Sequence, residues 1–491
     1  MPGPAERPEQ TKVELTKPEP TENEVAPAPP VNTSLAIWLL VGSAFVMILN
    51  ETIMSVALPA LVADLDISIG TAQWLTSGFL LTMAVVIPIT GFLLQRNTAR
   101  QVYLTSMSLF SAGTLVCALA PGFPMLMAGR IVQAAGTAVM VPLLMTSVIR
   151  LVPAERRGAT MGTITVVIAV APAIGPTLSG VILTTLGWRW MFWIVLPIAL
   201  VALGAGARWL RVRSQTRFVP LDLMSVALSA LAFGGLVFGL SSIGEATRGE
   251  ALVQPWLPTT VGALAMIVFV ARQLRLQREG WPLLDLRPLA HRPFVLSVVL
   301  IVLGMMSLFG VIILLPLYLQ YVVGVDPFVT GLAVLPGGLV MGLLGPFVGR
   351  LYDRVGARRL IIPGAVVLAA VLWVFTTLDA GSPLWEVVAL HVALVIGLSL
   401  MFTPLMTDAL GQLPGELDSH GSAIMATLQQ VAGAAGTALF VTVMTVFATD
   451  HAVAADVTGT RAAFVCAAII ATTVLPLALL VGRRTREPVP A

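Results

Sequence analysis

Glu51 is the one acidic residue that lies deep inside a long apolar run of this sequence. A carboxylate surrounded by hydrocarbon costs several kcal/mol, so such residues usually face a cavity and serve in ion or substrate pathways. A group that takes up a proton from one side of a membrane and releases it to the other needs surroundings of this kind. The alternative is a protonated side chain that forms a hydrogen bond with a neighbouring helix. We favour the functional interpretation and expect Glu51 to carry protons.

Three further polar residues in apolar runs are candidates for the same site. Arg130 cannot lose its charge, so it must find water, a carbonyl or an acid. We expect it to gate the site or to modulate the protonation of Glu51, or else to extend toward the membrane surface. Gln133 lies one turn further along the same face and is expected to form a hydrogen bond with a substrate. Asn50 is expected to be a polar partner in the cavity, or a contact that holds two helices together.

The face of the first run that carries Glu51 also carries Met47, Met54 and Ser55. Methionine adapts its shape and suits a promiscuous apolar pocket, although methionines at this spacing also pack in protein cores. In a later run, Gln429 and Gln430 are polar candidates for the same cavity.

A run of small residues and prolines comprises Ala171, Pro172, Gly175, Pro176, Ser179 and Gly180. Small side chains four residues apart allow two helices to approach closely, and each proline removes a backbone donor and bends its helix. We interpret this run as a hinge-like seam between two halves of the molecule. The alternative is ordinary close packing of helices. The two interpretations are hard to separate, because a seam of this kind would itself depend on close packing.

Two related segments at helix ends contain glycines and charges that could form a conformational latch: Gly91, Arg96 and Arg100 in the first, and Gly349, Asp353, Arg354, Gly356 and Arg358 in the second. Ion pairs and helix-end charges there could hold one conformation and break in another. Membrane topology alone would explain the arginines, but it would not explain Asp353 or the two glycines of the second segment.

The composition indicates that membrane-spanning helices position these residues. Hydrophobic residues make up 57% of the 491 and charged residues 11%, and the mean hydropathy is +0.93. A soluble globule carries about a quarter charged residues because they cover its surface. Most of the surface of this chain must therefore face something other than water, and we predict an all-α integral membrane protein embedded in a lipid bilayer.

The same composition excludes several classes of protein. The arginines lie at the ends of apolar runs, so the net charge of +3 does not indicate nucleic-acid binding. The two lysines, Lys12 and Lys17, lie in the N-terminal tail, so no P-loop lysine is present. The four histidines and two cysteines are scattered and form no metal motif or catalytic pattern. We therefore expect neither an enzyme nor a metal or other cofactor.

Crossing roughly 30 Å of hydrocarbon takes about twenty apolar residues. Fourteen runs meet this requirement: 35–58, 72–94, 103–121, 124–149, 159–186, 190–207, 221–243, 258–274, 294–319, 327–348, 360–378, 384–404, 421–448 and 461–482. Of the 28 Lys and Arg residues, 24 fall on the side shared by the two termini, three on the other side and one, Arg130, within a run. The positive-inside rule makes the richer side cytoplasmic, so both termini are predicted to be cytoplasmic.

An internal repeat divides the chain into two halves. Gly91 and Gly349 are 258 residues apart in similar segments, and Pro59 and Pro316 are 257 apart. Six-helix halves related in this way are an architecture of secondary transporters, whose substrate site lies between the halves. The repeat predicts a disordered tail at 1–34, a six-helix bundle at 35–207, a linker with two inserted helices at 208–293, a second bundle at 294–482 and a tail at 483–491.

Several of these segments resemble motifs of the major facilitator superfamily. The residues from Gly349 to Arg359 are similar to its cytoplasmic-loop motif, and the run 171–180 resembles the fifth-helix motif of its antiporters. The Arg130–Gln133 stretch resembles the fourth-helix motif, and the Leu49–Thr52 stretch resembles the first-helix signature of the fourteen-span drug:proton antiporters. The sequence Asn50-Glu51-Thr52 is similar to the subgroup that contains lincomycin-resistance exporters. Gln95 and Thr98 depart from the acid and the glycine that the first loop motif normally has.

The resemblance implies a fourteen-span fold of two six-helix bundles with two inserted helices. It also implies a proton-coupled antiporter that exports lipophilic drugs or related small amphiphiles by alternating access. Glu51 and Arg130 are the residues expected to couple proton movement to transport. A dedicated exporter of one endogenous metabolite or lipid-like compound is the alternative, and a non-transporting receptor is a weaker one. We expect a monomer in a bacterial cell membrane, driven by the proton gradient alone.

Overall fold

The computed structural model describes residues 33–67, 69–210, 220–246, 253–449 and 456–482. The predicted tails at 1–34 and 483–491 fall outside these ranges, apart from Thr33 and Ser34, which begin the first helix. The side chains of Ser55, Pro172 and Pro176 also lie outside the part of the structure that is described.

All regular structure in the described ranges is helical. The α-helices are α1 (Thr33–Leu65), α2 (Ile69–Val86), α3 (Thr90–Arg96), α4 (Ala99–Ala118), α5 (Phe123–Leu151), α6 (Arg157–Thr185), α7 (Arg189–Trp209), α8 (Leu223–Ser229), α9 (Gly235–Ala246), α10 (Trp256–Glu279), α11 (Arg292–Leu317), α12 (Pro327–Val355), α13 (Arg358–Phe375), α14 (Leu384–Gly411), α15 (Asp418–Val446) and α16 (Val457–Leu479). Thirteen stretches of the described residues are long and apolar enough to cross a membrane, and each coincides with a predicted run. The remaining predicted run, 159–186, is the 29-residue helix α6.

Two of the spans are built from shorter pieces. A 3-10 turn at Ile87–Ile89, which contains Pro88, joins α2 to α3, because proline cannot donate a backbone hydrogen bond. A π-helical turn at Ala230–Gly234 joins α8 to α9. Pro59, in contrast, does not close the first span, since α1 continues to Leu65.

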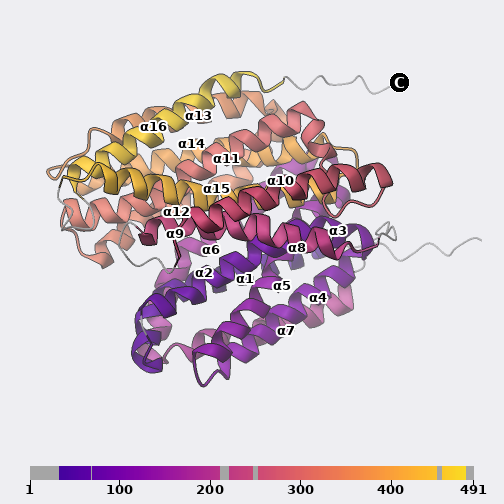
Figure 1. Cartoon of the computed structure of the whole chain (residues 1–491). Helices are drawn as coiled ribbons and strands as arrows, with labels where there is room; N and C mark the ends of the chain where they lie inside the picture. Colours follow the sequence, from indigo (N-terminus) through magenta and orange to yellow (C-terminus); the bar gives the residue numbers. More distant parts are fainter. Residues whose placement is uncertain (1–32, 68, 211–219, 247–252, 450–455, 483–491) are drawn as a thin grey trace, which may run out of the picture. The chain divides into compact units, whose positions relative to one another are not determined.

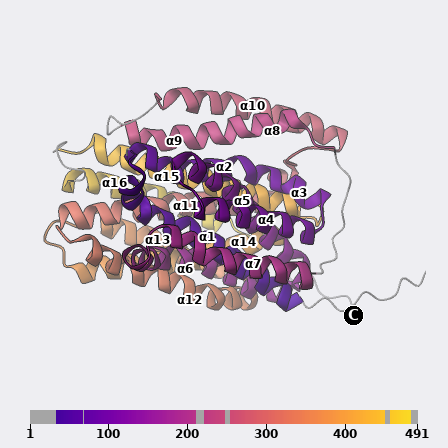
Figure 2. The same ribbon diagram turned by 90° about the horizontal axis from the view of Figure 1, so that it is seen from below.

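The helices form two bundles with the inserted helices beside them (Figure 1). We call α1–α7 the first bundle, in which α4 packs on α5 and α7, and α1 packs on α6. The second bundle, α11–α16, is held by contacts of α13 with α14 and α16, and of α11 with α15. The inserted helices α8–α10 form an outer layer on α2 of the first bundle and α15 of the second (Figure 2). The predicted architecture of two bundles with an inserted helix pair is confirmed.

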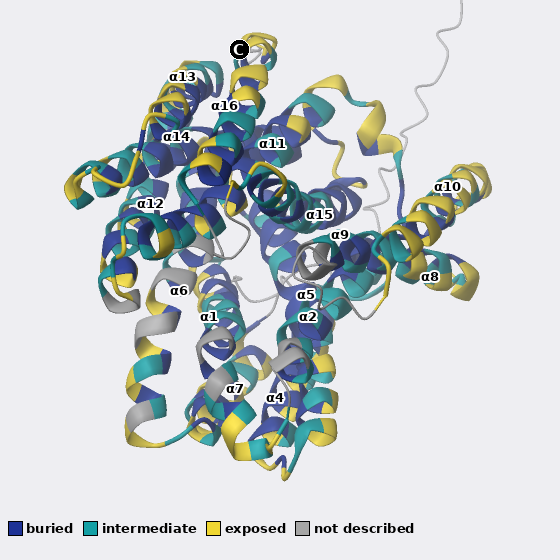
Figure 3. Cartoon of the chain, turned by 60° about the vertical axis from the view of Figure 1, so that its left-hand side comes forward, coloured by how far each residue is buried: buried dark blue, intermediate teal, exposed yellow. Residues whose placement is uncertain are grey.

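Burial follows this arrangement. Buried residues line the helices that face the interior, whereas α10 is largely exposed (Figure 3). The exposed residues of α10 include Leu264, Ile267 and Val268, so this face is apolar, as expected of a helix surrounded by lipid.

The two bundles meet most closely where α6 crosses α12. A Cβ atom on Gly162 would collide with the carbonyl oxygen of Gly345, and one on Gly349 would collide with the carbonyl oxygen of Gly158. The absence of side chains at these four glycines therefore allows the two backbones to touch.

Candidate functional site

Arg130 is the centre of a buried polar cluster in the first bundle, and its side chain has no exposed surface. Its Nε donates to the carbonyl oxygen of Leu75 at 3.3 Å, and one terminal nitrogen donates to Oε1 of Gln133 at 2.8 Å. The same nitrogen donates to Oδ1 of Asn50 at 3.4 Å. The guanidinium carbon lies 4.0 Å from the centre of the Phe79 ring, so a cation–π contact adds to these bonds. Arg130 does not extend to the membrane surface, and that alternative is wrong.

The other terminal nitrogen of Arg130, Nη2, has no hydrogen-bond partner among the described atoms. A buried donor without a partner costs about 1–3 kcal/mol, so a site that keeps one usually has a use for it.

Gln133 is held between Arg130 and α4. Its Nε2 donates to Oγ1 of Thr114 at 2.8 Å, and Thr114 in turn donates to the carbonyl oxygen of Phe110 at 2.6 Å. The contact is close because Gly113 has no side chain, and a Cβ atom there would lie 2.5 Å from the backbone nitrogen of Gln133. Both polar atoms of this fully buried amide therefore have hydrogen-bond partners. In this structure Gln133 holds Arg130 in place, and its amide does not face a cavity.

Asn50 and Glu51 point in different directions because successive residues of a helix are about 100° apart. Asn50 is buried and faces Arg130, whereas Glu51 is half-buried. No hydrogen bond or ion pair joins Glu51 to another side chain among the described residues. The amide therefore holds the cation in place, and the carboxyl group of the following residue keeps part of its surface accessible.

The remaining candidates for a cavity are distributed unevenly. Met47 and Met54 are almost completely buried in the hydrophobic core, so packing explains both of them. Gln429 and Gln430 are half-buried on α15, and Nε2 of Gln429 is buried without a partner among the described atoms. The two glutamines lie in the second bundle, on the helix that contacts α2 and α5 of the first.

Gly175 and Ser179, in the run of small residues on α6, pack against α1. A Cβ atom on Gly175 would lie 3.0 Å from Cβ of Thr52, and Oγ of Ser179 donates to the carbonyl oxygen of Ile53 at 2.9 Å. Ala171 is fully buried, whereas no described atom lies within 4 Å of a Cβ built at Gly180. The described contacts of Gly175 and Ser179 are thus close packing within one bundle, whereas glycines at the α6–α12 crossing bring the two bundles together.

The second latch segment does join the two bundles. Both carboxylate oxygens of Asp353 accept backbone N–H groups at the start of α6, from Gly158 at 2.9 Å and from Ala159 at 3.0 Å. A negative charge at a helix N-terminus is favourable because unpaired N–H groups and the helix dipole meet there. Gly356 has a φ of +82°, a left-handed conformation that ends α12 and suits glycine. Arg354 lies in the last turn of α12 and Arg358 begins α13, so both flank this contact.

The first latch segment behaves differently. Arg100 donates to the carbonyl oxygen of Ala207, and Arg96 lies over the Phe92 ring, so these two contacts are within the first bundle. Thr98 replaces the expected glycine because it caps α4, where its Oγ1 accepts the N–H of Gln101. Gln95 provides a contact between the bundles, a 3.3 Å hydrogen bond from Nε2 to the carbonyl oxygen of Glu416.

Further contacts between the bundles involve residues that the sequence did not single out. Arg150, at the end of α5, donates to Oγ of Ser419 at 3.0 Å and lies 3.9 Å from the Asp418 carboxylate. Thr146 and Ser422 share a hydrogen bond of 2.8 Å. The paired positions are hundreds of residues apart, so no local sequence pattern predicts these contacts.

We call the end of the bundles that carries Arg150 and Arg354 the arginine-rich end. Hydrogen bonds of Gln95, Thr146, Arg150 and Asp353, and the ion pair of Arg150 with Asp418, join the two bundles at this end. A further hydrogen bond of 2.9 Å joins Thr165 to Thr403. The arginine-rich end is therefore closed.

The fold and these motifs agree with a family comparison. The model of the Major Facilitator Superfamily matches residues 40–437, most of the chain. The chain belongs to the major facilitator superfamily. The predicted family is thus confirmed, and its members are transporters and not enzymes.

Relatives with assigned names cover nearly the whole chain. The lincomycin resistance protein LmrB of Listeria monocytogenes is 42% identical over 84% of this chain and 86% of its own length. LmrB of Bacillus subtilis is 40% identical over 82% of this chain and 84% of its own length. A multidrug resistance protein B homolog of Mycobacterium tuberculosis is 30% identical, over 81% and 73% respectively.

Solved structures share the fold at low sequence identity. The human organic anion transporter MFSD10 aligns with a TM-score of 0.64 at 14% identity, covering 92% of this chain and all of that chain. The proton:xylose symporter XylE aligns with a TM-score of 0.64 at 15% identity, covering 92% and 96%. These likenesses support the helical architecture and say nothing about the substrate.

Proposed function

We propose that this protein exports lipophilic drugs or related amphiphiles from the cytoplasm in exchange for protons. The observation that carries the proposal is the position of Glu51, a half-buried acid, directly after Asn50, which accepts a hydrogen bond from the fully buried cation Arg130 in the same membrane bundle. Charged residues in the hydrocarbon region are costly and are retained where ions or substrates pass. The names of the relatives, which include lincomycin and multidrug resistance proteins, support the drug as cargo.

Protonation of Glu51 would change the surroundings of Arg130. While Glu51 is ionised, its charge offsets the buried guanidinium, which is also held by Asn50 and Gln133. When Glu51 takes up a proton, Arg130 keeps these neutral acceptors but loses the compensating charge. An uncompensated positive charge in a low-dielectric site raises the electrostatic energy of this conformation, so protonation favours a different arrangement of the bundles.

The state of the structure fits one half of an alternating-access cycle. With the arginine-rich end on the cytoplasmic side, as the positive-inside rule places it, the closed contacts seal the path to the cytoplasm. The protein is then outward-facing in a bacterial cell membrane, with both termini in the cytoplasm. Protons would enter at Glu51 from outside, and each charge moved is worth about 2.3 kcal/mol per 100 mV, so no other energy source is needed.

The test is transport by the purified chain in liposomes with an imposed pH gradient. Lincomycin and a set of lipophilic cations serve as cargo, and a pH-sensitive dye reports proton movement. Glu51→Gln should abolish both fluxes while the protein still inserts and folds. Glu279→Gln makes the same chemical change at an exposed position on α10 and should transport at the parent rate. Proton-driven export by Glu51→Gln at the parent rate would disprove the assignment.

A further inference from the structure

The inserted helices end in a buried turn that reaches the contact between the bundles. We call Trp281–Arg287, which follows α10, the clasp. Gly280 turns the chain at the end of α10 with a φ of +84°, and Leu283 and Leu284 are buried in the main hydrophobic core. The clasp is therefore a packed part of the structure at the arginine-rich end.

Two side chains fix the conformation of the clasp. Oε1 of Gln273, a fully buried residue of α10, accepts the backbone N–H groups of Leu283 at 2.9 Å and Leu284 at 3.2 Å. The carboxylate of Asp285 accepts the N–H and the Nε of Arg287 at 2.9 Å and 2.8 Å. These bonds leave the backbone N–H of Asp285 pointing away from the clasp.

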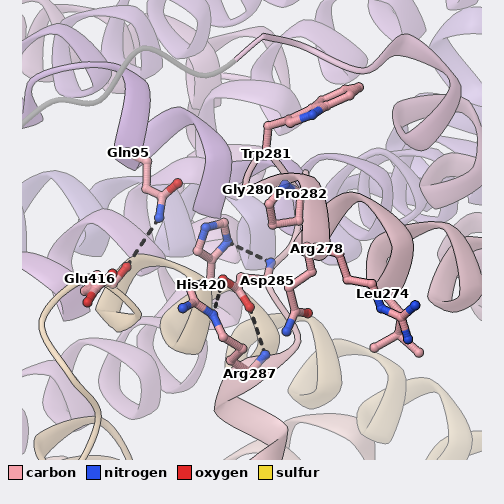
Figure 4. A pocket seen from close by; sticks show the side chains of 11 residues that line it. Gln95, Leu274, Arg278, Gly280, Trp281, Pro282, Asp285, Arg287, Glu416 and His420 are labelled. Carbon is pink, nitrogen blue, oxygen red and sulfur yellow. Dashed lines mark hydrogen bonds and ion pairs between the residues drawn. The ribbon is translucent and has the colours of Figure 1, made fainter.

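That N–H donates to Nδ1 of His420, on α15, at 3.2 Å (Figure 4). A hydrogen bond accepted at Nδ1 leaves the ring proton on Nε2 and defines how the ring is turned. His420 is almost completely buried, so its ring orientation is set by this contact and by its packing.

The ring of His420 lies against Gly91 of α3, in the opposite bundle. A Cβ atom on Gly91 would lie 2.7 Å from Nδ1 and 3.3 Å from Cα of His420, so the ring fits there only because residue 91 is glycine. Beside the ring, Gln95 bonds to the backbone of Glu416. A cavity of about 400 Å³ at this point is lined by α3, α15, α10 and the clasp.

We propose that the clasp positions His420 for its contact with Gly91, and that the inserted helices thereby stabilise the closed arginine-rich end. The inference rests on the alternating-access function proposed above. Opening of this end separates α3 from α15 and breaks the contact of His420 with Gly91. The hydrogen bond from Asp285 keeps the ring in the orientation that closure requires, so reclosure does not have to order it again. Gln273 and Asp285 act through His420 and are positioning residues.

The experiment measures the distance between spin labels on the two bundles in lipid nanodiscs. Labels at positions 156 and 412, both exposed and one on each bundle, are placed in a chain carrying Cys117→Ala and Cys466→Ala. Longer distances report an open arginine-rich end. Neither a proton gradient nor a drug is present, so the result does not depend on proton coupling or on the identity of the cargo.

Four variants separate positioning from general destabilisation. His420→Leu, which cannot accept the bond, and Gln273→Leu, which loosens the clasp at a distance, should each raise the ratio of open to closed molecules about fivefold, as expected for a lost hydrogen bond. His420→Asn keeps an acceptor oxygen near the place of Nδ1 and should stay within about twofold of the parent. His391→Leu changes a buried histidine on α14 and should leave the ratio unchanged.

The decisive measurement is the double variant. Gln273→Leu should add nothing when His420→Leu is already present, because the clasp acts through that ring. Parent-like distances in Gln273→Leu, or effects of the two substitutions that multiply, would overturn the proposal.

Discussion

The carboxylate of Asp353, at the end of α12, caps the first turn of α6 by accepting the backbone N–H of Gly158 at 2.9 Å. This hydrogen bond crosses from one bundle to the other, so it exists only while the arginine-rich end is closed. The neighbouring glycines at the α6–α12 crossing bring the two helix ends close enough for it to form. An acid and a glycine of one sequence motif therefore act at one contact between the bundles.

Loss of this capping charge should favour opening. Asp353→Asn weakens a cap that stabilises the closed state by about 1 kcal/mol, so the ratio of open to closed molecules should rise about fivefold. The same spin-label pair measures it. Asp456→Asn is the matched control, because Asp456 caps α16 within one bundle by accepting the N–H of Gly459 at 2.7 Å. Equal ratios for both variants would show that Asp353 does not act as a latch.

A side chain added at the crossing should also open this end. A Cβ atom in Gly162→Ala would lie 2.6 Å from the carbonyl carbon of Gly345 and 2.8 Å from Cα of Pro346, so backbone atoms must move apart. Gly180→Ala adds the same methyl group to the same helix where no described atom lies within 4 Å. We expect longer label distances in the first variant and parent-like distances in the second. A closed end in Gly162→Ala would contradict the role given to these glycines.

Removal of the amide that holds Arg130 should destabilise the first bundle. Gln133→Leu takes away the acceptor at 2.8 Å and leaves a further guanidinium donor buried without a partner, at a cost of about 1–3 kcal/mol. The thermal unfolding midpoint in detergent should fall accordingly. Gln412→Leu, at an exposed position, serves as the comparison and should unfold with the parent. A parent-like midpoint for Gln133→Leu would mean that another group takes over the acceptor role.

The stability of the inserted helices should depend on pH through Asp222. Both of its oxygens accept hydrogen bonds from Arg272, at 2.7 Å and 2.9 Å, and these bonds lower the pKa of Asp222 from 3.8 to about 2, helped by Ser225. Because the folded pKa lies below the unfolded one, the stabilisation is fully present above about pH 4 and is lost as the pH falls toward 2.

Asp222→Asn should therefore lower the free energy of unfolding at pH 7 by about 1–2 kcal/mol, a modest amount because Arg272 is partly exposed. The thermal unfolding midpoint at pH 7 should fall with it. The difference between variant and parent should shrink as the pH is lowered from 4 toward 2. Thermal unfolding at a series of pH values checks this, and a gap that stays constant over that range would rule out the ionised pair as the cause.

The amino-acid sequence by itself determined the number and order of the membrane helices, because crossing hydrocarbon requires long apolar runs whatever their neighbours are. It also predicted the family, the inserted helix pair and Asp353 as part of a latch. A motif at a helix end combines local requirements, such as a left-handed glycine at position 356 and a charge near a helix terminus, and these can be recognised without a tertiary structure.

Only the tertiary structure decided which surfaces these helices present to one another. The spacing of Gly175 and Ser179 predicts close approach of a helix, yet it cannot say that the neighbour is α1 and not the other bundle. The hydrogen bond between Arg130 and Asn50, which leaves Glu51 partly accessible, likewise depends on how α1 is rotated against α5. In a chain this apolar the helix rotation is set by packing and by hydrogen bonds between residues far apart in sequence, so no local pattern contains it.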